Sequence, residues 1–407
     1  GGMRLGENLY AEALVALDAD TGERLWHFQT VHHGLWDYDI GSAPNLVDIE
    51  VDGEPIKAVA QVSKTAFTYV FDRITGEPVW PIEERPVPAS TVPGERAHPT
   101  QPFPTKPAPF DRQGVSEEDL IDFTPEIAAE AREIASNFLL GPIYTPPIVR
   151  GERGKIATFV VPGAGGGANF PGASIDPETG ILYVPSATRP HGMSLITPPQ
   201  GTSDWPYVIQ MERQVGPFGL PLLKPPYRRI TAIDLNTGEH VWQIPFGMGP
   251  ANHPLLEHLG LPPLGSVYDD VIAEGGILVT KTLLISFLAQ KDEISPDARG
   301  SILVALDKAT GATVGEVLVG QRLHGPPMSY MHEGKQYIAV QVGYGGAYAL
   351  TGGLESPNEI PSRDGRMMIF DDVRCFGTLE VFEKLSDSKA LNKLGIEPFS
   401  EDLNVNY

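Results

Sequence analysis

Two carboxylates and a lysine in the first part of the chain are of types that could do chemistry together. Asp37 and Asp39 stand two residues apart, so on an extended backbone both side chains point to the same face. Carboxylate oxygens are the hard ligands that calcium prefers. Lys64 lies in an otherwise apolar stretch, AVAQVSKTAFTYVF, which argues against a solvated surface position. Spacing does not separate the two aspartates; for Asp37 the alternative to a chemical role is the capping of a turn, whereas for Asp39 a non-catalytic role is the preferred interpretation.

A glycine-rich stretch, GAGGGANF over residues 163–170, contains the next candidate, Asn169. It weakly fits the dinucleotide fingerprint Gly-x-Gly-x-x-Ala. We reject that interpretation, because Pro171 and a hairpin signal follow and leave no helix to hold a pyrophosphate. The glycine run either allows the backbone to approach a cofactor closely or forms a turn.

Histidines offer weaker candidates. His32 and His33 are adjacent, and neighbouring side chains on a strand point in opposite directions, so they do not easily bind one ion together. We expect at least one of them to be structural. His324, in LHGPP, is a further candidate for the mouth of a substrate funnel.

The elements that must position these residues are indicated by a repeat, Asp-x-x-Thr-Gly, which occurs five times between strand-like flanks. The Asp carboxylate can accept hydrogen bonds from backbone amides two or three residues on, and the glycine allows positive φ. Each copy therefore predicts a β-hairpin. In three copies a Trp follows the Asp at the same offset, where it can wedge between neighbouring modules. The copies start at Asp18, Asp72, Asp176, Asp234 and Asp307, and the tryptophans are Trp26, Trp80 and Trp242.

This repeat predicts an all-β fold built as a β-propeller. The shortest interval, from Asp18 to Asp72, is close to the roughly 50 residues of the longer propeller repeats. The long interval after Asp72 is either two blades or one blade with an insertion. We favour an insertion over residues 81–140, because prolines recur throughout 81–109 and exclude a central strand. A short helix is expected after them, capped by Thr124 with Pro125 at its first position.

Composition excludes several classes of protein. The net charge of -22 makes a nucleic-acid partner a poor hypothesis, because a phosphate backbone would be repelled. Cys375 is the one cysteine, so neither an intrachain disulfide nor a Cys-x-x-Cys-His haem site can form. There is no run of 18 apolar residues, and residues 1–4 do not start a signal peptide. We expect any export signal to lie upstream of this chain.

At this point the motifs carry a family resemblance. The modules LVALDADTGERLW and TAIDLNTGEHVW resemble the tryptophan-docking motifs of quinoprotein dehydrogenases, which use pyrroloquinoline quinone (PQQ). HHGLWDYD (32–39) resembles the active-site segment of the membrane-bound glucose dehydrogenase branch. The resemblance extends to about Ala349 and includes the segments 77–88, 99–107, 217–221 and 325–330.

The resemblance implies an eight-bladed propeller, of which this chain has motifs for roughly five or six. We therefore expect residues 1–407 to form a single domain that is the C-terminal portion of a longer protein, because an unclosed propeller exposes raw sheet edges.

The resemblance also implies roles for individual residues. Asp37 matches the family's catalytic base, which is also a ligand of the calcium ion, and Trp36, which precedes it, is expected to bind the cofactor. Lys64 matches a Lys or Arg that donates to the quinone oxygens. Asn169 matches an amide near PQQ, although Phe170 stands where the family often has Trp. The family's other calcium ligands and the aromatic floor under PQQ have no match in this chain.

The implied function is PQQ- and calcium-dependent oxidation of an aldose or polyol, with electrons passed to ubiquinone or a cytochrome. We expect a periplasmic enzyme, with any inner-membrane anchor in an N-terminal region outside this chain. Quinate-type and alcohol-type enzymes are alternatives within the class. A non-catalytic propeller scaffold and a degenerate enzyme without cofactor binding are alternatives outside it, and Asp37 and Lys64 argue against the scaffold.

Overall fold

The computed structural model describes residues 4–213, 216–267, 276–291, 299–319, 323–342 and 366–371. Two compact units divide the chain. The first comprises Gly1–Val271 with Ala309–Gly311, and the second comprises Ile272–Lys308 with Ala312–Tyr407. That the chain forms a single domain over residues 1–407 stays a prediction.

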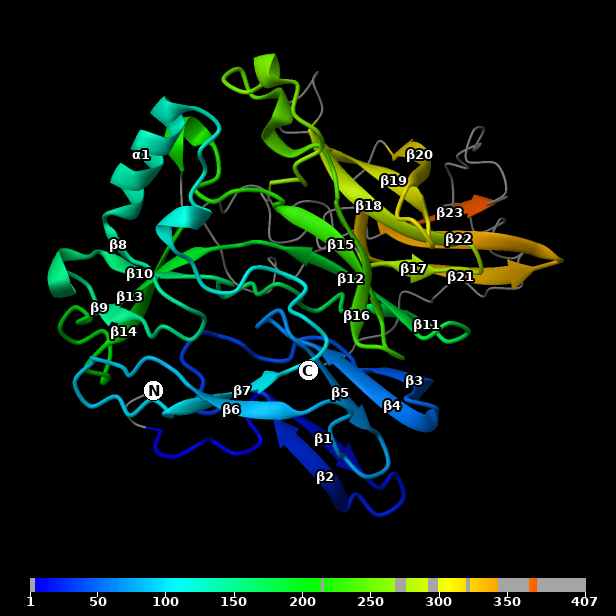
Figure 1. Ribbon diagram of the computed structural model, residues 1–407, viewed down its shortest axis with the longest axis horizontal. Coiled ribbons are helices and arrows are strands. Elements are labelled where there is room, and N and C mark those ends of the chain that lie inside the picture. The colour runs from blue at the N-terminus through cyan, green and yellow to red at the C-terminus, as the bar shows by residue number, and fades with distance from the viewer. Residues whose placement is uncertain are drawn as a thin grey trace, which may run out of the picture. The chain divides into compact units, whose positions relative to one another are not determined.

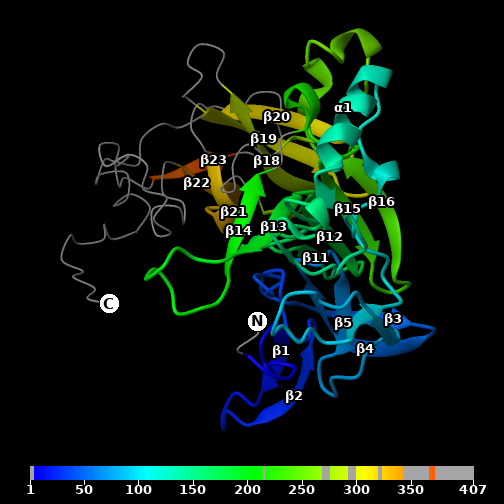
Figure 2. The same cartoon turned by 90° about the vertical axis from the view of Figure 1, so that its left-hand side faces the viewer.

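The first unit begins with three small antiparallel sheets. Their strands are β1 (Ala13–Leu17) and β2 (Arg24–Gln29); β3 (Asn45–Val51), β4 (Glu54–Val62) and β5 (Thr68–Asp72); and β6 (Ile82–Pro86) and β7 (Thr100–Pro104). Both views of the ribbon show β1 and β2 next to β3–β5 (Figures 1 and 2). A shared apolar cluster joins these two sheets, with Phe28 and Trp26 packed against Tyr69 and Phe71.

Two larger sheets complete the first unit. The five-stranded sheet contains β8 (Phe138–Leu139), β9 (Ile148–Val149), β10 (Ala157–Val160), β13 (His191–Ile196) and β14 (Val208–Arg213). The four-stranded antiparallel sheet contains β11 (Ser174–Asp176), β12 (Ile181–Ala187), β15 (Arg228–Asp234) and β16 (Glu239–Pro245). Between β12 and β15 the chain leaves the four-stranded sheet, because β13 pairs with β10 and β14 pairs with β13.

The second unit contains two antiparallel sheets. Their strands are β17 (Leu278–Val279), β18 (Leu283–Lys291), β19 (Arg299–Asp307) and β20 (Thr313–Val319); and β21 (Leu323–His332), β22 (Lys335–Val342) and β23 (Arg366–Asp371). One buried cluster, which includes Phe287, Leu303 and Ile338, takes side chains from both sheets.

Helix is confined to short segments of the described chain. The α-helix α1 (Pro125–Ala135) begins as predicted, with the Thr124 side chain accepting a hydrogen bond from Ile127 N at 3.3 Å. The 3-10 helices are η1 (Glu117–Asp119), η2 (Glu152–Gly154), η3 (Pro217–Gly219), η4 (Gly249–Asn252) and η5 (Glu257–Leu259). None of the helices that the structure describes is long and apolar enough to cross a membrane. The expectation of an all-β chain with one short helix is confirmed.

The hairpin turns form as the repeat predicts. The Oδ1 atom of Asp18 accepts hydrogen bonds from the backbone amides of Asp20 and Thr21, at 3.1 and 2.8 Å. The turns that begin at Asp72, Asp176 and Asp234 have the same kind of bond. The glycines that close the five turns all have φ between +73° and +79°. A left-handed backbone of this kind costs glycine little.

The tryptophans dock onto turns of other modules. A Cβ added to Gly76 would lie 2.6 Å from Cγ of Trp26, whose indole also donates to Arg73 O at 3.1 Å. A Cβ added to Gly238 would likewise lie against the ring of Trp80, and one added to Gly311 would lie against the ring of Trp242. Each ring therefore covers the closing glycine of a later Asp-x-x-Thr-Gly turn.

Two copies of the repeat lie in one sheet. The turns at Asp176 and Asp234 join β11 to β12 and β15 to β16, which belong to one sheet. The interval between these two copies therefore does not separate two blades. The reason is that one sheet can contain two hairpins, here β11–β12 and β15–β16, and the same kind of turn can close both of them.

Within the range 81–140, the proline-rich part forms the isolated pair β6–β7 and the later part contains α1. A two-stranded sheet tolerates prolines because each strand has a free edge. The boundaries of this insertion stay a prediction.

Candidate functional site

The carboxylate segment alternates between buried and exposed side chains. Trp36 and Tyr38 are 1% and 0% exposed, whereas the carboxylates of Asp37 and Asp39 are 58% and 54% exposed. Asp37 has a φ of +64°, a left-handed conformation that aspartate tolerates better than most residues. Both carboxylates are thus presented on the open side of the segment.

Lys64 brings the two carboxylates together. It lies in the turn after β4, and its side chain is only 7% exposed. Its Nζ atom lies 3.4 Å from Oδ2 of Asp37 and forms a second, shorter contact with Oδ1 of Asp39. A buried ammonium needs such partners, because an unpaired buried charge is strongly unfavourable. Sequence reasoning favoured Asp37 over Asp39, yet in the structure both pair with the lysine.

The glycine-rich loop packs directly on Lys64. Gly166 has a φ of +70°, and a Cβ there would lie 2.4 Å from Cγ of Lys64. Gly167 N donates to Lys64 O at 2.9 Å. The glycine run therefore allows close approach to a lysine of the site, and its close approach to a cofactor stays a prediction.

Asn169 lies at the end of the same loop, close to the segment that follows Asp39. Its Nδ2 donates to Gly165 O at 3.1 Å, and its Oδ1 accepts from Phe170 N at 2.8 Å. A Cβ on Gly41 would meet Oδ1 of Asn169 at 2.9 Å. The ring of Phe170 is 77% exposed, so beside the site this chain presents an apolar surface.

Trp36, the residue before Asp37, is buried. Its indole donates to Thr145 O at 2.9 Å, and its ring contacts Tyr38 and Tyr144. The Tyr38 hydroxyl donates to Pro162 O at 2.5 Å, just before the glycine-rich loop. Trp36 has almost no exposed surface, so its contact with a cofactor stays a prediction.

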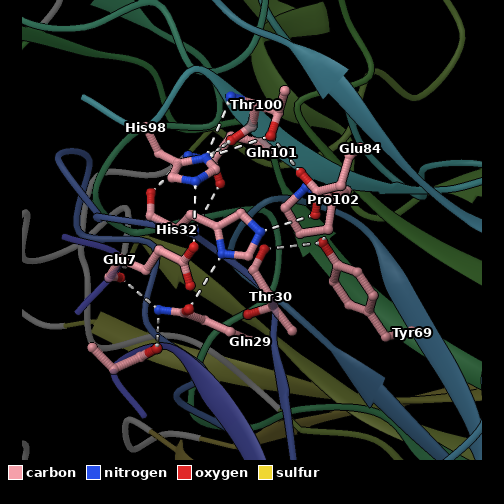
Figure 3. Close-up of polar contacts among 11 residues, drawn as sticks. Glu7, Gln29, Thr30, His32, Tyr69, Glu84, His98, Thr100, Gln101 and Pro102 are labelled. Atoms are coloured by element: carbon pink, nitrogen blue, oxygen red, sulfur yellow. Dashed lines mark hydrogen bonds and ion pairs between the residues drawn. The ribbon is translucent and has the colours of Figure 1, made fainter. Parts of the chain in front are cut away.

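The two histidines have separate partners. His32 Nε2 lies 2.9 Å from Oε1 of Glu84 (Figure 3), and His33 Nε2 lies 2.9 Å from Oε1 of Glu95. Each ring therefore has a structural carboxylate partner of its own. The side chain of His324 lies outside the described residues.

Glu12 is a residue that sequence reasoning missed. A Cβ on Gly34 would fall 1.9 Å from its Oε1, and its Oε2 is buried without a hydrogen-bond partner. Burial raises the pKa of Glu12; Arg4 opposes this effect, and the charges of Asp39 and Asp37 add to it. No sequence signal marked Glu12, because it precedes a strand like any exposed turn residue.

A buried ion pair was also missed. Arg229 Nη2 lies 3.1 Å from Oδ1 of Asp111, and the two side chains are 7% and 1% exposed. Thr188 donates to the same oxygen at 2.6 Å. Burial lowers the pKa of Arg229, and Asp111 opposes that shift. A Cβ on Gly167 would lie 3.3 Å from Cβ of Asp111, so this pair also lies against the glycine-rich loop.

The donor set of this site fits an anionic quinone and, in part, a hard cation. The ammonium of Lys64 offers a positive charge to carboxylate or quinone oxygens, and Asp37 and Asp39 offer hard oxygen ligands. No three His, Cys, Asp or Glu side chains form a metal-binding group in the part of the chain that the structure describes. The site can accept a proton at an exposed carboxylate and contribute two ligands to a cation, and its ammonium could also donate to an oxygen of a ligand.

Blade-like antiparallel sheets with tryptophans docked on hairpin turns define a class, the β-propellers with Trp-containing repeats. Residues 1–338 match the family model described as "PQQ: Glucose/ethanol/alcohol dehydrogenase, beta-propeller domain". Since the match spans most of the 407 residues, the chain belongs to this family. The predicted propeller fold and the resemblance to quinoprotein dehydrogenases of the glucose dehydrogenase-like branch are confirmed.

Individual relatives agree with this assignment. The chain is 33% identical over 373 residues to the glycerol dehydrogenase large subunit of Gluconobacter oxydans (strain 621H), a match that covers 83% of this chain and 47% of that protein. It is 29% identical over 387 residues to the quinoprotein glucose dehydrogenase of Escherichia coli (strain K12), covering 86% and 44%. The chain thus spans less than half the length of these curated relatives.

A solved structure shows the same fold. The crystal structure of quinohemoprotein alcohol dehydrogenase from Comamonas testosteroni aligns with a TM-score of 0.54 and 23% identity. The alignment covers 93% of this chain and 44% of that one.

Proposed function

We propose that this chain provides the proton-accepting carboxylate and an orienting lysine of a PQQ- and calcium-dependent dehydrogenase that oxidises an aldose or polyol. One observation carries the proposal. The buried Lys64 holds its ammonium against two half-exposed carboxylates, one of which, Asp37, matches the family's base by the resemblance of its sequence motif. A scaffold has no need for this arrangement at an open surface.

The side chains have complementary roles in this proposal. Asp37 accepts the proton of the substrate hydroxyl as hydride leaves the adjacent carbon. Lys64 donates to the oxygens on which negative charge builds, and Asp39 keeps the ammonium oriented. When bound, PQQ supplies the two-electron acceptor for the hydride and calcium polarises it.

Binding of the cofactor would use the surface around Lys64. Asn169 would offer its amide at the edge of the site, and Trp36 would support Asp37 from below, in contact with the cofactor if the segment shifts. Asp37 would also bind calcium. Because calcium takes six to eight oxygen ligands, it requires others besides the two carboxylates.

The destination of the electrons is also part of the proposal. Ubiquinone or a cytochrome would accept them, in the periplasm, and any membrane anchor would belong to a segment outside this chain. Quinate and simple alcohols are the alternative substrates. The relatives support the class as a whole, since their names include both a glycerol and a glucose dehydrogenase.

A dye-linked activity assay tests the proposal. The full-length reading frame is reconstituted with PQQ and Ca²⁺ and offered glucose, other aldoses, polyols, quinate and simple alcohols. We expect dye reduction that requires both PQQ and Ca²⁺. No turnover on any substrate, together with no PQQ binding, would favour the scaffold or the degenerate enzyme.

A further inference from the structure

The proline-rich hairpin β6–β7 contacts the segment that leads to the carboxylates. We propose that this hairpin positions Asp37, with Gln101 as the positioning residue that holds the backbone of His32. The inference rests on the proposed role of Asp37 as the base, and it assigns a role to motifs 77–88 and 99–107, which that proposal leaves unused.

The first observation is the pairing of one side-chain amide with both backbone groups of His32. Gln101 is 0% exposed. Its Oε1 accepts from His32 N at 2.8 Å, and its Nε2 donates to His32 O at 2.7 Å (Figure 3). His32 is not paired with a neighbouring strand, and the side-chain amide of Gln101 takes the place of such a strand by binding both backbone groups. A buried backbone without these bonds would be costly.

The second observation is that the other strand of the hairpin binds the His32 ring. Glu84, on β6, contacts His32 Nε2 through Oε1 at 2.9 Å and accepts from Thr100 Oγ1 through Oε2 at 2.7 Å. The ring of His98, in the loop between the strands, lies 4.6 Å from that of His32, centroid to centroid. Figure 3 shows these side chains grouped around His32. The hairpin therefore holds both the backbone and the side chain of one residue.

The third observation concerns Thr30, two residues before His32. The buried hydroxyl of Tyr69, from β5, lies 3.3 Å from Thr30 O and 3.2 Å from Pro102 O. Strand β5, the hairpin and residues 30–32 therefore meet at one point. The segment is anchored here, and it is anchored again at Trp36 through Thr145.

These anchors determine where Asp37 lies relative to Lys64. Only a short irregular stretch separates His32 from the second anchor, so a displacement at His32 is transmitted to the carboxylate. Misplacement of a reacting group by about 1 Å can reduce a rate about 100-fold. The segment is also held at His33 and Tyr38, so the loss of one anchor among several should have a smaller effect.

Gln101→Leu tests this role, because it puts an apolar side chain without branching at Cβ in place of the amide and removes both hydrogen bonds. We expect kcat to fall roughly 10-fold while KM changes less than about two-fold, since the base moves and the substrate surface does not. Amide hydrogen exchange, which needs no activity, should become faster in residues 30–39. Gln336→Leu is the control. It removes an amide that donates to Ser329 Oγ at 2.8 Å in the second unit, and it should leave kcat and this exchange unchanged.

A second, milder pair of variants decides the matter if Gln101→Leu fails to fold. Glu84→Ala removes the half-exposed partner of His32, whereas Glu83→Ala removes the adjacent carboxylate, which pairs with Arg85 instead. We expect a roughly threefold fall in kcat and faster exchange in residues 30–39 for Glu84→Ala, and neither change for Glu83→Ala.

The outcomes separate this inference from the proposed function. Wild-type kcat and unchanged exchange in Gln101→Leu, or equal effects in Glu84→Ala and Glu83→Ala, would overturn the positioning role. If the wild-type protein is inactive on every substrate, the proposed function fails. Exchange in residues 30–39 then still decides whether the hairpin holds the segment.

Discussion

Gly166 lies against the stem of Lys64 so closely that a Cβ at this glycine would be 2.4 Å from the lysine Cγ. Side-chain atoms essentially cannot approach so near, so the loop and the lysine can occupy their places only while residue 166 lacks a side chain. The same glycine has a φ of +70°, which adds a backbone requirement to the steric one.

Gly166→Ala should therefore displace the loop or Lys64. We expect the left-handed backbone to lower the free energy of unfolding by about 1–2 kcal/mol. The contact with Lys64 should lower it by at least as much again. Gly154→Ala is a matched control, because Gly154 has a φ of +71° and nothing within 4 Å of its Cβ position. Thermal unfolding of both variants measures the difference, and equal losses would contradict the contact.

Lys64→Ala should weaken PQQ binding. Hydrogen bonds to charged groups contribute about 1.5–3 kcal/mol, which corresponds to roughly 10- to 100-fold in affinity. A fluorescence titration of the protein with PQQ measures this. Lys224→Ala, which breaks the pair with Asp122 at 2.8 Å elsewhere in the unit, should titrate like the wild type. An unchanged titration of Lys64→Ala would remove this lysine from the cofactor site.

Asp37→Asn should abolish most turnover and leave folding intact. Loss of a general base costs about 10²- to 10⁴-fold, and the exposed carboxylate contributes little to packing. Steady-state kinetics and circular dichroism measure the two effects. Asp39→Asn tests the alternative that the spacing left open: a larger loss there than in Asp37→Asn would transfer the role of base to Asp39. Asp48→Asn, an exposed aspartate paired with Arg73, should keep wild-type rates.

Gly76→Ala should loosen the docking of Trp26. Its Cβ would meet the indole at 2.6 Å, whereas Gly22, with a φ of +73°, has nothing within 4 Å. We expect Gly22→Ala to cost about 1–2 kcal/mol through its backbone alone, and Gly76→Ala to cost more. Trp26 fluorescence should shift only in Gly76→Ala. If Gly76→Ala shows no shift, the docking of the indole does not depend on this glycine.

Glu12 should make stability depend on pH. Its pKa is raised above 4.5, first by burial and further by the charges of Asp39 and Asp37. The folded state therefore favours the protonated form of Glu12. The stability that this form gives below pH 4.5 is lost as the pH rises through the raised pKa. Glu12→Gln should raise the unfolding temperature at pH 7 and change it little at pH 4.

Glu84 gives a comparison of opposite sign. Burial alone would raise its pKa, but hydrogen bonds from His32 and Thr100 outweigh burial and lower the pKa below 4.5. The stability that Glu84 contributes is present above pH 4.5, and it is lost as the pH falls through the lowered pKa. Glu84→Gln should thus lower the unfolding temperature at pH 7, with a smaller difference at pH 3.5. The same sign for both variants would contradict these assignments.

The amino-acid sequence by itself determined the local elements of this protein. The turn at Asp18, the cap at Thr124 and the closing Gly22 depend on bonds within three or four residues, so type and spacing suffice to predict them. The family motif around Asp37 and the apolar surroundings of Lys64 likewise marked both residues before their contact was known.

Only the tertiary structure decided how these elements combine. The sequence could not show that the turns at Asp176 and Asp234 share one sheet, because strand order depends on contacts between distant segments. Nor could it show that Lys64 pairs with Asp39 as well as Asp37, or that Gln101 holds His32. Each of these contacts joins residues far apart in the chain, and a side chain's partner across such a distance is set by packing, which no local spacing encodes.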